Sequence, residues 1–277
     1  MPPAARTRLR DNRDVRPARV RLDAAVSERT GMTRSQARSL IMEARVRVDG
    51  AVSTKAGHPT AIDAAIEIDR PRRYVSRGGE KLEAALDGFE VDVRGTQALD
   101  VGASTGGFTD CLLQRGASHV TSVDVGYGQL DWRLRNDPRV TVMERSNFRL
   151  LPPSAFAGGF DTIVVDASFI SLRTILKRAA PELRENGHAV CLIKPQFEAG
   201  RDRLGSGGVV RDPEVHRAVL LETRDAILEL GLVPVAVVAS PLVGPAGNRE
   251  FFAHVRHGGT PYTDADVERA LQTGALQ

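Results

Sequence analysis

Short apolar runs rich in β-branched residues alternate with amphipathic helical patterns between residues 98 and 255. This alternation constrains the fold most, because parallel strands need helical crossovers and so build a doubly wound α/β sheet. No helix separates the last two runs, so we expect them to form an antiparallel hairpin at the sheet edge. The predicted strands cover residues 98–101, 120–124, 140–143, 162–166, 189–194, 235–239 and 251–255, and the clearest helices cover 108–115, 170–183 and 213–230.

Composition excludes several other classes of protein. Of the 277 residues, 42% are hydrophobic and 26% are charged, as in a globular chain with room for a large and a small domain. Cysteine occurs only at Cys111 and Cys191, which excludes a disulfide scaffold and a zinc module built on cysteines. The six histidines show no zinc-ligand spacing, so we expect no metal.

Residues 230–248 carry no charge, and hydropathy alone would mark them as a membrane span. Pro234, Pro241 and Pro245 interrupt the segment, which is better explained as a loop, a buried strand and a turn. The N-terminus has no apolar stretch typical of a signal peptide. We therefore expect a cytoplasmic protein that does not enter a membrane.

Charge is spread unevenly along the chain. Residues 1–80 carry 17 Lys and Arg against 10 Asp and Glu, while the remainder carries 21 against 25. The net charge of +3 therefore combines a basic front with a mildly acidic body. This asymmetry predicts a polyanionic partner, although an arginine-rich tail that meets only solvent would produce the same pattern. Residues 1–19 lack any apolar period, and we expect them to form a disordered tail.

Residues 20–69 predict a small domain of two helices and a hairpin. Thr33 and Gln36 have the spacing of a capping box, which marks the start of the second helix. Alternating valines around the Asp-Gly pair at 49–50 are typical of a hairpin, because its turn needs positive φ angles.

Three arginines of this segment, Arg34, Arg38 and Arg45, fall within about 40° of each other on a helical wheel. Such a row of guanidinium groups suits the phosphates of an RNA backbone. The segment resembles the RNA-binding domain named after ribosomal protein S4, in the runs Arg21-Leu22-Asp23, Arg34–Ala37, Leu40-Ile41, Val46–Gly50 and Lys55. This S4-like resemblance implies RNA contacts by Arg21, Arg34, Arg38, Arg45, Arg47 and Lys55. A helical dimerisation module with a solvated arginine edge remains the alternative.

Residues 70–80 are interrupted by proline and paired glycines, and we expect a linker there before a second domain over 81–277. Arg72 and Arg73 in this linker are further candidates for RNA contact. Tyr74 would either stack on a base or pack at the domain interface.

A glycine-rich turn follows the first predicted strand and enters a helix, in the run LDVGASTGGFT from Leu99. Such a turn brings free backbone N–H groups close to a ligand. The dinucleotide fingerprint has Gly where this chain has Ser104, and the carboxylate of Asp100 would repel a pyrophosphate but attract an ammonium. Asp124, at the end of the second strand, is placed to accept hydrogen bonds from ribose hydroxyls.

These features favour S-adenosylmethionine, which carries an ammonium and a ribose but no phosphate. A nicotinamide cofactor and a purely structural turn remain alternatives. Glu144 and Asn147 follow the third strand and either approach the adenosyl group or belong to a surface loop. The predicted cofactor residues are Asp100, Gly102, Ser104, Thr105, Gly106, Gly107, Phe108, Asp124 and Asn147.

Four ionisable residues mark the predicted reaction centre. Asp166 and Lys194 end the fourth and fifth strands, Glu250 precedes the seventh, and Lys81 begins a helix ahead of the sheet. The chain has only four lysines against 34 arginines, and two of the four are these. Lysine can give up its proton whereas arginine cannot, which favours chemistry over a solvated charge at these sites.

Four runs resemble the FtsJ-type ribose methyltransferases: Asp100–Thr109, DASFIS from Asp166, KPQFE from Lys194 and GNREFF around Glu250. The chain as a whole resembles the TlyA family. This resemblance rests on these four runs, on the S4-like segment 20–69, and on the runs VSRGGEKL from Val75 and DVGYGQL from Asp124. The resemblance implies a Rossmann-like class I methyltransferase fold and 2′-O-methylation of cytidine in ribosomal RNA, in both subunits or the large one alone. It also implies a catalytic tetrad of Lys81, Asp166, Lys194 and Glu250. Tyr74 stands where some relatives have Trp, which leaves the role of the linker in doubt.

Three other functions stay open from the sequence. A membrane-active haemolysin is a label attached to this family, and only the uncharged residues 230–248 support it. A non-catalytic RNA-binding factor would keep the same fold, and a nicotinamide oxidoreductase is disfavoured by Ser104. The glycine-rich residues 200–210 are either a mobile substrate loop or an ordinary connection before a helix that begins at Asp212-Pro213. The substrate form, naked RNA or ribosomal subunit, and the oligomeric state are not indicated.

Overall fold

The computed structural model describes residues 18–42, 44–68, 73–152, 155–156, 158–244 and 247–273. The chain divides into two compact units, the first ending at Pro71 and the second beginning at Arg72. All but the last two residues of the predicted basic tail lie outside the described residues.

Seven strands form one sheet in the second unit, in the order β11-β12-β10-β9-β6-β7-β8. The strands β6 to β10 pair in parallel, whereas β12 runs antiparallel to both of its neighbours. The predicted α/β sheet and its edge hairpin are therefore confirmed. The strands are β6 (Gln97–Val101), β7 (His119–Val123), β8 (Val140–Met143), β9 (Phe160–Val165), β10 (Leu183–Ile193), β11 (Val233–Ala239) and β12 (Phe251–Arg256).

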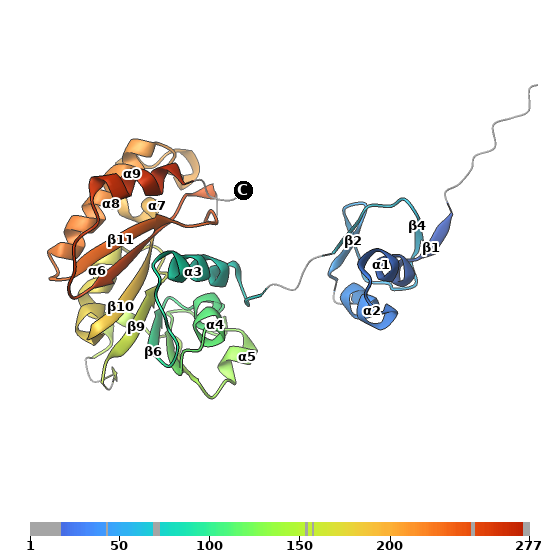
Figure 1. The fold of residues 1–277 in the computed structure, drawn as a ribbon, viewed down its shortest axis with the longest axis horizontal. Coiled ribbons are helices and arrows are strands. Elements are labelled where there is room, and N and C mark those ends of the chain that lie inside the picture. The colour runs from blue at the N-terminus through green and yellow to red at the C-terminus, as the bar shows by residue number, and fades with distance from the viewer. Residues whose placement is uncertain are drawn as a thin grey trace, which may run out of the picture. The chain divides into compact units, whose positions relative to one another are not determined.

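Helices cover both faces of this sheet (Figure 1). One face packs against α3 (Arg77–Gly88), α4 (Gly107–Gln114) and the short α5 (Trp132–Arg135), and their apolar side chains form one core cluster. The other face packs against α6 (Leu172–Ala179), α8 (Pro213–Leu228) and α9 (Asp264–Gln272), which share a second cluster. The residues that the structure describes also form α7 (Pro195–Glu198) and the 3₁₀ turns Phe148–Leu150, Ala180–Glu182, Arg201–Arg203 and Ser206–Gly208.

The segment predicted as a linker belongs largely to the second unit. Helix α3 begins at Arg77 rather than Lys81, and Tyr74 is 2% exposed in the core cluster of this unit. The Tyr74 side chain therefore packs within this unit and is not exposed for stacking. Gly79 serves close packing, because a Cβ atom there would overlap the Tyr74 side chain. Gly107 of α4 does the same from the other side, because a Cβ atom there would overlap Ser76.

One predicted helix is too long. The pattern predicted a helix over 170–183, but α6 ends at Ala179 and a 3₁₀ turn follows. Pro181 lacks the N–H group that a continuing helix would need, so the chain turns and enters β10 at Leu183. The predicted start of α8 is confirmed, since the Asp212 side chain accepts a hydrogen bond from Glu214 N (2.9 Å) beside Pro213.

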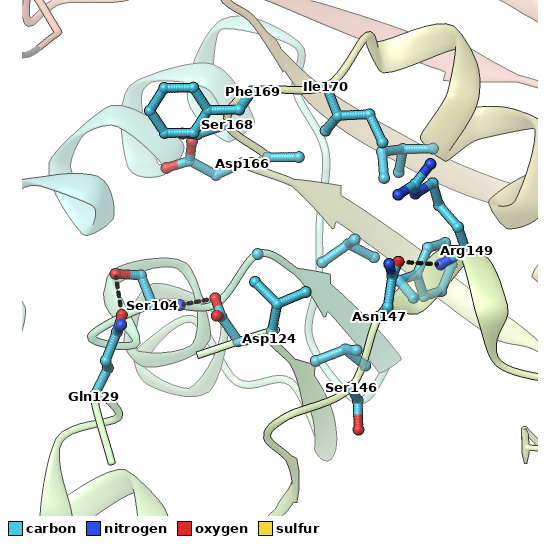
Figure 2. A pocket seen from close by; sticks show the side chains of 17 residues that line it. Ser104, Asp124, Gln129, Ser146, Asn147, Arg149, Asp166, Ser168, Phe169 and Ile170 are labelled. Atoms are coloured by element: carbon cyan, nitrogen blue, oxygen red, sulfur yellow. Dashed lines mark hydrogen bonds between the residues drawn. The ribbon is translucent and has the colours of Figure 1, made fainter. Parts of the chain in front are cut away.

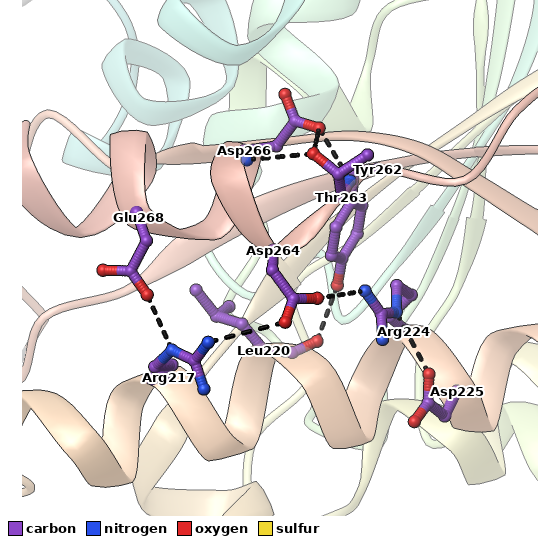
Figure 3. Close-up of polar contacts among 9 residues, drawn as sticks. All are labelled: Arg217, Leu220, Arg224, Asp225, Tyr262, Thr263, Asp264, Asp266 and Glu268. Atoms are coloured by element: carbon purple, nitrogen blue, oxygen red, sulfur yellow. Dashed lines mark hydrogen bonds and ion pairs between the residues drawn. The ribbon is translucent and has the colours of Figure 1, made fainter.

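Polar contacts fasten α9 to α8 (Figure 3). Arg217 and Arg224 of α8 both pair with Asp264, and the buried Tyr262 hydroxyl donates to Leu220 O (2.7 Å). Beyond this network, the Arg249 guanidinium donates to three carbonyls at the end of α9, those of Ala270, Leu271 and Thr273. The C-terminal helix is thereby tied to the segment that leads into β12.

Within its described residues, the first unit contains two helices and two small sheets around a core of Leu22, Val26, Ala37, Ile41 and Val46. Strand β1 pairs with β4, and β2 lies between β3 and β5. Its elements are β1 (Arg19–Arg21), α1 (Leu22–Thr30), α2 (Arg34–Met42), β2 (Val46–Val48), β3 (Ala51–Ser53), β4 (Pro59–Ala61) and β5 (Ile66–Ile68).

Two local predictions for this unit are confirmed. Thr33 and Gln36 exchange the hydrogen bonds of a capping box at the start of α2. The hairpin between β2 and β3 turns through Asp49 and Gly50, which have φ angles of 50° and 80°.

The helical wheel was wrong for Arg45. Helix α2 ends at Met42, and Ala44 has a φ of 57°, so the chain has left the helix before Arg45. The N–H groups of Ala44 and Arg45 bond back to Ile41 O and Leu40 O, which is a Schellman-type ending. Arg45 therefore does not extend the row of Arg34 and Arg38.

Asp23 provides a test of this unit's stability. Its carboxylate is 3% exposed and accepts hydrogen bonds from Arg21 and Arg34, which hold its pKa well below the usual range. A carboxyl with a lowered pKa stabilises the fold above its unfolded pKa of about 3.9, and this contribution is lost as pH falls further. Urea unfolding of this unit can be followed by the NMR signals of Val26 and Ile41. As the pH is lowered past about 4, we expect the urea concentration at the unfolding midpoint to decrease strongly in the wild type and much less in Asp23→Asn. Equal pH dependence in the two proteins would contradict this assignment.

Candidate active site

Two neighbouring cavities open beyond the carboxyl ends of the central strands. One, of about 370 Å³, lies among the residues that follow β6, β7, β8 and β9 (Figure 2). The other, of about 500 Å³, lies between the start of α3, the glycine-rich turn and the ends of β9 and β10. Both are lined by Gly102, Ser104, Asp166 and Ser168, so the two cavities adjoin. We call the first the ribose-side cavity and the second the lysine-side cavity.

The glycine-rich turn divides the two cavities. Gly102 has a φ of 89°, and a Cβ atom there would lie 2.5 Å from Asp166 O. Gly106 has a φ of 95°, and a Cβ atom there would overlap Leu134. Only glycine combines these backbone angles with such close neighbours. The turn is therefore built to pack tightly against the end of β9 and against α5.

Asp124 lines the ribose-side cavity, where the sequence predicted a ribose contact (Figure 2). Its two carboxylate oxygens accept hydrogen bonds from Ser104 N (2.8 Å) and Gly126 N (2.6 Å). Ser104 has a φ of 49°, which is unusual for a residue other than glycine. The Asp124 carboxylate thus holds the turn in this conformation at the wall of the cavity.

Asn147 also lines this cavity, and its side chain accepts a hydrogen bond from Arg149 N (3.2 Å). Glu144 does not line it. The Glu144 carboxylate accepts hydrogen bonds from Gly128 N and from Arg135, so it fastens the loop before α5. The surface-loop alternative for Glu144 therefore fits the structure better than a contact to an adenosyl group.

Asp100 lies beneath the turn rather than at the cavity surface. Its carboxyl is fully buried, and Oδ2 accepts a hydrogen bond from Thr109 Oγ1 (2.6 Å) while Oδ1 has no partner. Burial, aided by the charges of Asp166 and Asp124, raises its pKa to about 7. In this structure Asp100 supports the turn from within the core and lines neither cavity.

The remaining predicted cofactor residues differ in position. Thr105, Gly107 and Phe108 line the lysine-side cavity, whereas Gly106 lines neither of the two. Gly106 is instead the residue that precedes α4.

The four predicted catalytic residues all line the lysine-side cavity. They form two ion pairs. Lys81 Nζ lies 2.5 Å from Glu250 Oε2, and Lys194 Nζ lies 2.6 Å from Asp166 Oδ1. The second contact is ionic, because its direction is not that of a hydrogen bond, and Lys194 instead donates to Ser168 Oγ (2.8 Å).

The Lys81–Glu250 pair is the more deeply buried of the two. The Glu250 side chain is inaccessible and that of Lys81 is 10% exposed. Glu250 Oε1 has no hydrogen-bond partner, and a Cβ atom on Gly244 would overlap it. The absence of a side chain at Gly244 therefore leaves room for the Glu250 carboxylate. Sequence analysis did not identify this role of Gly244, because it considered only polar and charged residues around Glu250.

Comparison with known proteins places this arrangement in a family. The FtsJ-like methyltransferase family matches residues 74–257. A Mycobacterium tuberculosis protein named 16S/23S rRNA (cytidine-2′-O)-methyltransferase TlyA is 47% identical over 212 residues, which cover 76% of each chain. The chain belongs to the TlyA family of FtsJ-like methyltransferases.

Two further relatives of this family carry the name hemolysin. Hemolysin A of Brachyspira hyodysenteriae is 40% identical over 237 residues, covering 85% of this chain and 99% of the relative. A solved structure described as a candidate hemolysin from Streptococcus thermophilus has a TM-score of 0.71 at 38% identity, covering 92% of this chain and 94% of its own. Within the described residues, no helix is long and apolar enough to cross a membrane.

Sequence analysis missed an aromatic pair at the edge of the site. Phe169 is 90% exposed and lines the ribose-side cavity, and its ring centroid lies 4.9 Å from that of Phe197. Lys194 Nζ in turn lies 5.9 Å from the Phe197 ring. Phe169 belongs to the run DASFIS and Phe197 to the run KPQFE. Their closeness in sequence to Asp166 and Lys194 could have identified them as residues of the site.

The predicted RNA-binding residues have different surroundings. Arg38 and Lys55 are exposed in the first unit, and Arg21 and Arg34 are also exposed but share the carboxylate of Asp23. Arg47 on β2 is half-buried. Arg38 and Lys55 are therefore the two exposed cations of the predicted set in this unit that do not share the Asp23 carboxylate.

Two further cations predicted to contact RNA, Arg72 and Arg73, follow the first unit in the sequence. Arg72 is outside the described residues. Arg73 belongs to the second unit and pairs with Glu83. Among the residues that the structure describes, no group of three or more His, Cys, Asp or Glu side chains is placed to hold a metal.

The segment 200–210 contains two short 3₁₀ turns and is fastened to the strand entry by Asn248. The Asn248 side chain accepts from Val210 N (3.0 Å) and donates to Gly208 O (3.3 Å). The segment lines neither of the two cavities. These contacts fit an ordinary connection better than a substrate loop.

The buried Lys81–Glu250 pair yields a stability test. Lys81→Met leaves the Glu250 carboxylate buried without its partner, and we expect a loss of about 3–5 kcal/mol in the free energy of unfolding. Adding Glu250→Gln removes the isolated charge and should recover much of this loss. Guanidinium unfolding followed by Trp132 fluorescence measures both, since the single Trp lies in the second unit. Additive losses in the double-mutant cycle would show that the two charges are not coupled.

Proposed function

We propose that this protein transfers a methyl group from S-adenosylmethionine to the ribose 2′-hydroxyl of cytidine in ribosomal RNA. The observation that carries the proposal is that two lysine–carboxylate pairs meet in the lysine-side cavity, which adjoins the ribose-side cavity. The name of the Mycobacterium tuberculosis relative supports the same reaction.

The residues of the ribose-side cavity fit the cofactor. Asp124 offers carboxylate lone pairs to ribose hydroxyls, and Asn147 adds an amide on the same wall. The turn between the cavities brings Ser104 and Thr105 to the lysine side, and the Asp166 carboxylate faces both cavities. Bound S-adenosylmethionine would supply an electrophilic methyl group. Asp100 would contribute from below, by holding the turn.

The lysine-side cavity supplies the groups that a ribose hydroxyl needs. A hydroxyl is a weak nucleophile and must be held in line and relieved of its proton. Lys194 would orient the 2′-hydroxyl or, as the neutral amine, accept its proton, while Asp166 and Ser168 hold the lysine head in place. Glu250 would hold Lys81, which is left to contact the nucleotide.

Ribosomal RNA as the substrate class rests on the relatives and on the basic front of the chain. The Mycobacterium tuberculosis relative is named for 16S and 23S rRNA, and a Campylobacter jejuni relative, 32% identical over 184 residues, is named for 23S rRNA alone. Both subunits, or the large one only, therefore remain substrates to test. We assign residues 20–69 as the S4-like RNA-binding domain, and an rRNA substrate implies action in the cytoplasm.

Methyl transfer to ribosomal RNA tests the proposal directly. With a tritiated methyl donor and isolated subunits, we expect Lys194→Ala to reduce transfer at least about 100-fold, in line with the loss of a positioned acid–base group. Glu250→Gln should also reduce transfer, because Lys81 loses the carboxylate that holds it. The matched control is Lys177→Ala, since Lys177 is an exposed lysine on α6 that lines neither cavity. Ribose-methylation mapping of the product RNA locates the nucleotide. Full transfer by folded, cofactor-binding Lys194→Ala protein would refute the assignment.

The RNA-binding role proposed for residues 20–69 predicts a change of KM rather than of kcat. Replacing the exposed Arg38 and Lys55 by Ala should raise KM for the RNA while kcat stays nearly constant, because these cations bind phosphates and do not touch the reacting atoms. In a plot of the logarithm of the RNA-binding constant against the logarithm of salt concentration, the slope should become less steep by about 0.7–0.9 for each phosphate that the protein no longer neutralises. An unchanged KM and salt slope would favour the dimerisation alternative for this domain.

A further inference from the structure

Three contacts join the loop after β9 to the short helix after β10. Lys194 holds Asp166 and Ser168 at the cavity end of the loop. The rings of Phe169 and Phe197 meet in the middle. At the far end, Glu198 contacts the first residues of α6. The first contact belongs to the tetrad and the second lies at the rim, but the reaction scheme above gives the third no role.

The Glu198 carboxylate uses both of its oxygens in this third contact. Its Oε2 accepts a hydrogen bond from Ser171 Oγ (2.8 Å) and its Oε1 accepts one from Leu172 N (2.7 Å). Ser171 precedes α6, and its side chain makes no capping bond to the helix. Glu198 therefore caps α6 from another element, with its charge at the positive end of the helix dipole.

Lys194 and Glu198 occupy opposite ends of one rigid element. Lys194 is the N-cap of the four-residue helix α7 and Glu198 is its last residue. Pro195 fixes the backbone at the first helical position. The two side chains thus hold the loop 166–172 at its two ends, so a shift of one end moves the loop relative to the lysine.

The loop needs such anchors because its backbone is strained. Phe169 has a φ of 62°, a conformation that costs a bulky residue on the order of 1–3 kcal/mol. Its ring is 90% exposed, so burial does little to offset this cost. Strain of this kind persists only where the surrounding contacts determine the conformation.

We propose that Glu198 is a positioning residue for the methyl transfer, which holds the loop 166–172 so that Asp166 and Ser168 keep the Lys194 ammonium in place. The inference rests on the proposed function, since it assigns Lys194 its role there. Glu198 acts through the loop and lines neither of the two cavities.

The kinetic test compares two substitutions at Glu198. Glu198→Ala removes both acceptors and should lower kcat about 10- to 100-fold, the range expected when a reacting group is misplaced by about 1 Å. Glu198→Gln keeps an acceptor for Leu172 N, and its amide can still bond the Ser171 hydroxyl, so kcat should stay within about threefold of wild type. The matched control is Glu222→Ala, which removes an exposed glutamate paired with Arg203 and should leave kcat unchanged.

A structural readout separates this inference from the proposed function. Hydrogen–deuterium exchange should increase in Glu198→Ala over the peptide 166–172 and stay unchanged in the glycine-rich turn 102–107. Ser171→Ala, which removes only one of the two hydrogen bonds to Glu198, should show a smaller change of both exchange and kcat. These exchange measurements need neither RNA nor methyl donor.

Each outcome bears on the inference. A purely structural cap would lower Tm in Glu198→Ala, by about 2–4 °C, but leave kcat of the folded enzyme unchanged, and that result would overturn the positioning role. Equal loss of kcat in the Ala and Gln variants would also overturn it. If the wild type fails to methylate RNA, the proposed function fails, while faster exchange confined to 166–172 would still establish the anchor.

Discussion

The contact between the backbones that follow β6 and β9 determines the geometry of the site. A side chain at Gly102 would collide with Asp166 O, so only glycine lets the turn lie directly against the end of the next strand. Because of this closeness, the same residues line both cavities, and a ligand on the Asp124 side would lie next to the lysine side. Group transfer requires such direct contact between two binding sites.

Paired charges give the lysine-side cavity its chemical character. Each lysine has its own carboxylate, so the cavity holds two ammonium groups without an uncompensated buried charge. The pairs also differ in accessibility. The Asp166 side chain is 26% exposed and the Glu250 side chain is inaccessible, so Asp166 can itself meet a ligand whereas Glu250 acts through Lys81.

Much of this fold could be predicted because its signals are local. The strand periods, the capping box at Thr33 and the Asp-Gly hairpin depend on neighbours a few residues apart, and all three were confirmed. The errors arose where a local pattern was overridden by contacts made elsewhere. The glycines at 78–79 resembled a linker, but they allow close packing of α3 against Tyr74 and α4. Arg45 fitted the helical wheel, but the positive φ of Ala44 ends the helix first.

The tetrad shows the same division. Its members were predicted from their positions at strand ends, from the scarcity of lysine and from family runs, and they line one cavity, but their pairing could not be predicted. Lys81 and Glu250 are 169 positions apart, and only the packing of α3 beside the entry to β12 brings them together. Asp100 looked like a ligand residue, yet the structure places it below the turn, because its side chain points to the sheet face that α4 covers, where Thr109 donates to it. The sequence alone determined the order of strands and helices, the basic front and the set of candidate reactive side chains, since these depend on residue type and short spacing. The tertiary structure decided which of those side chains share a cavity, because that depends on how distant segments pack.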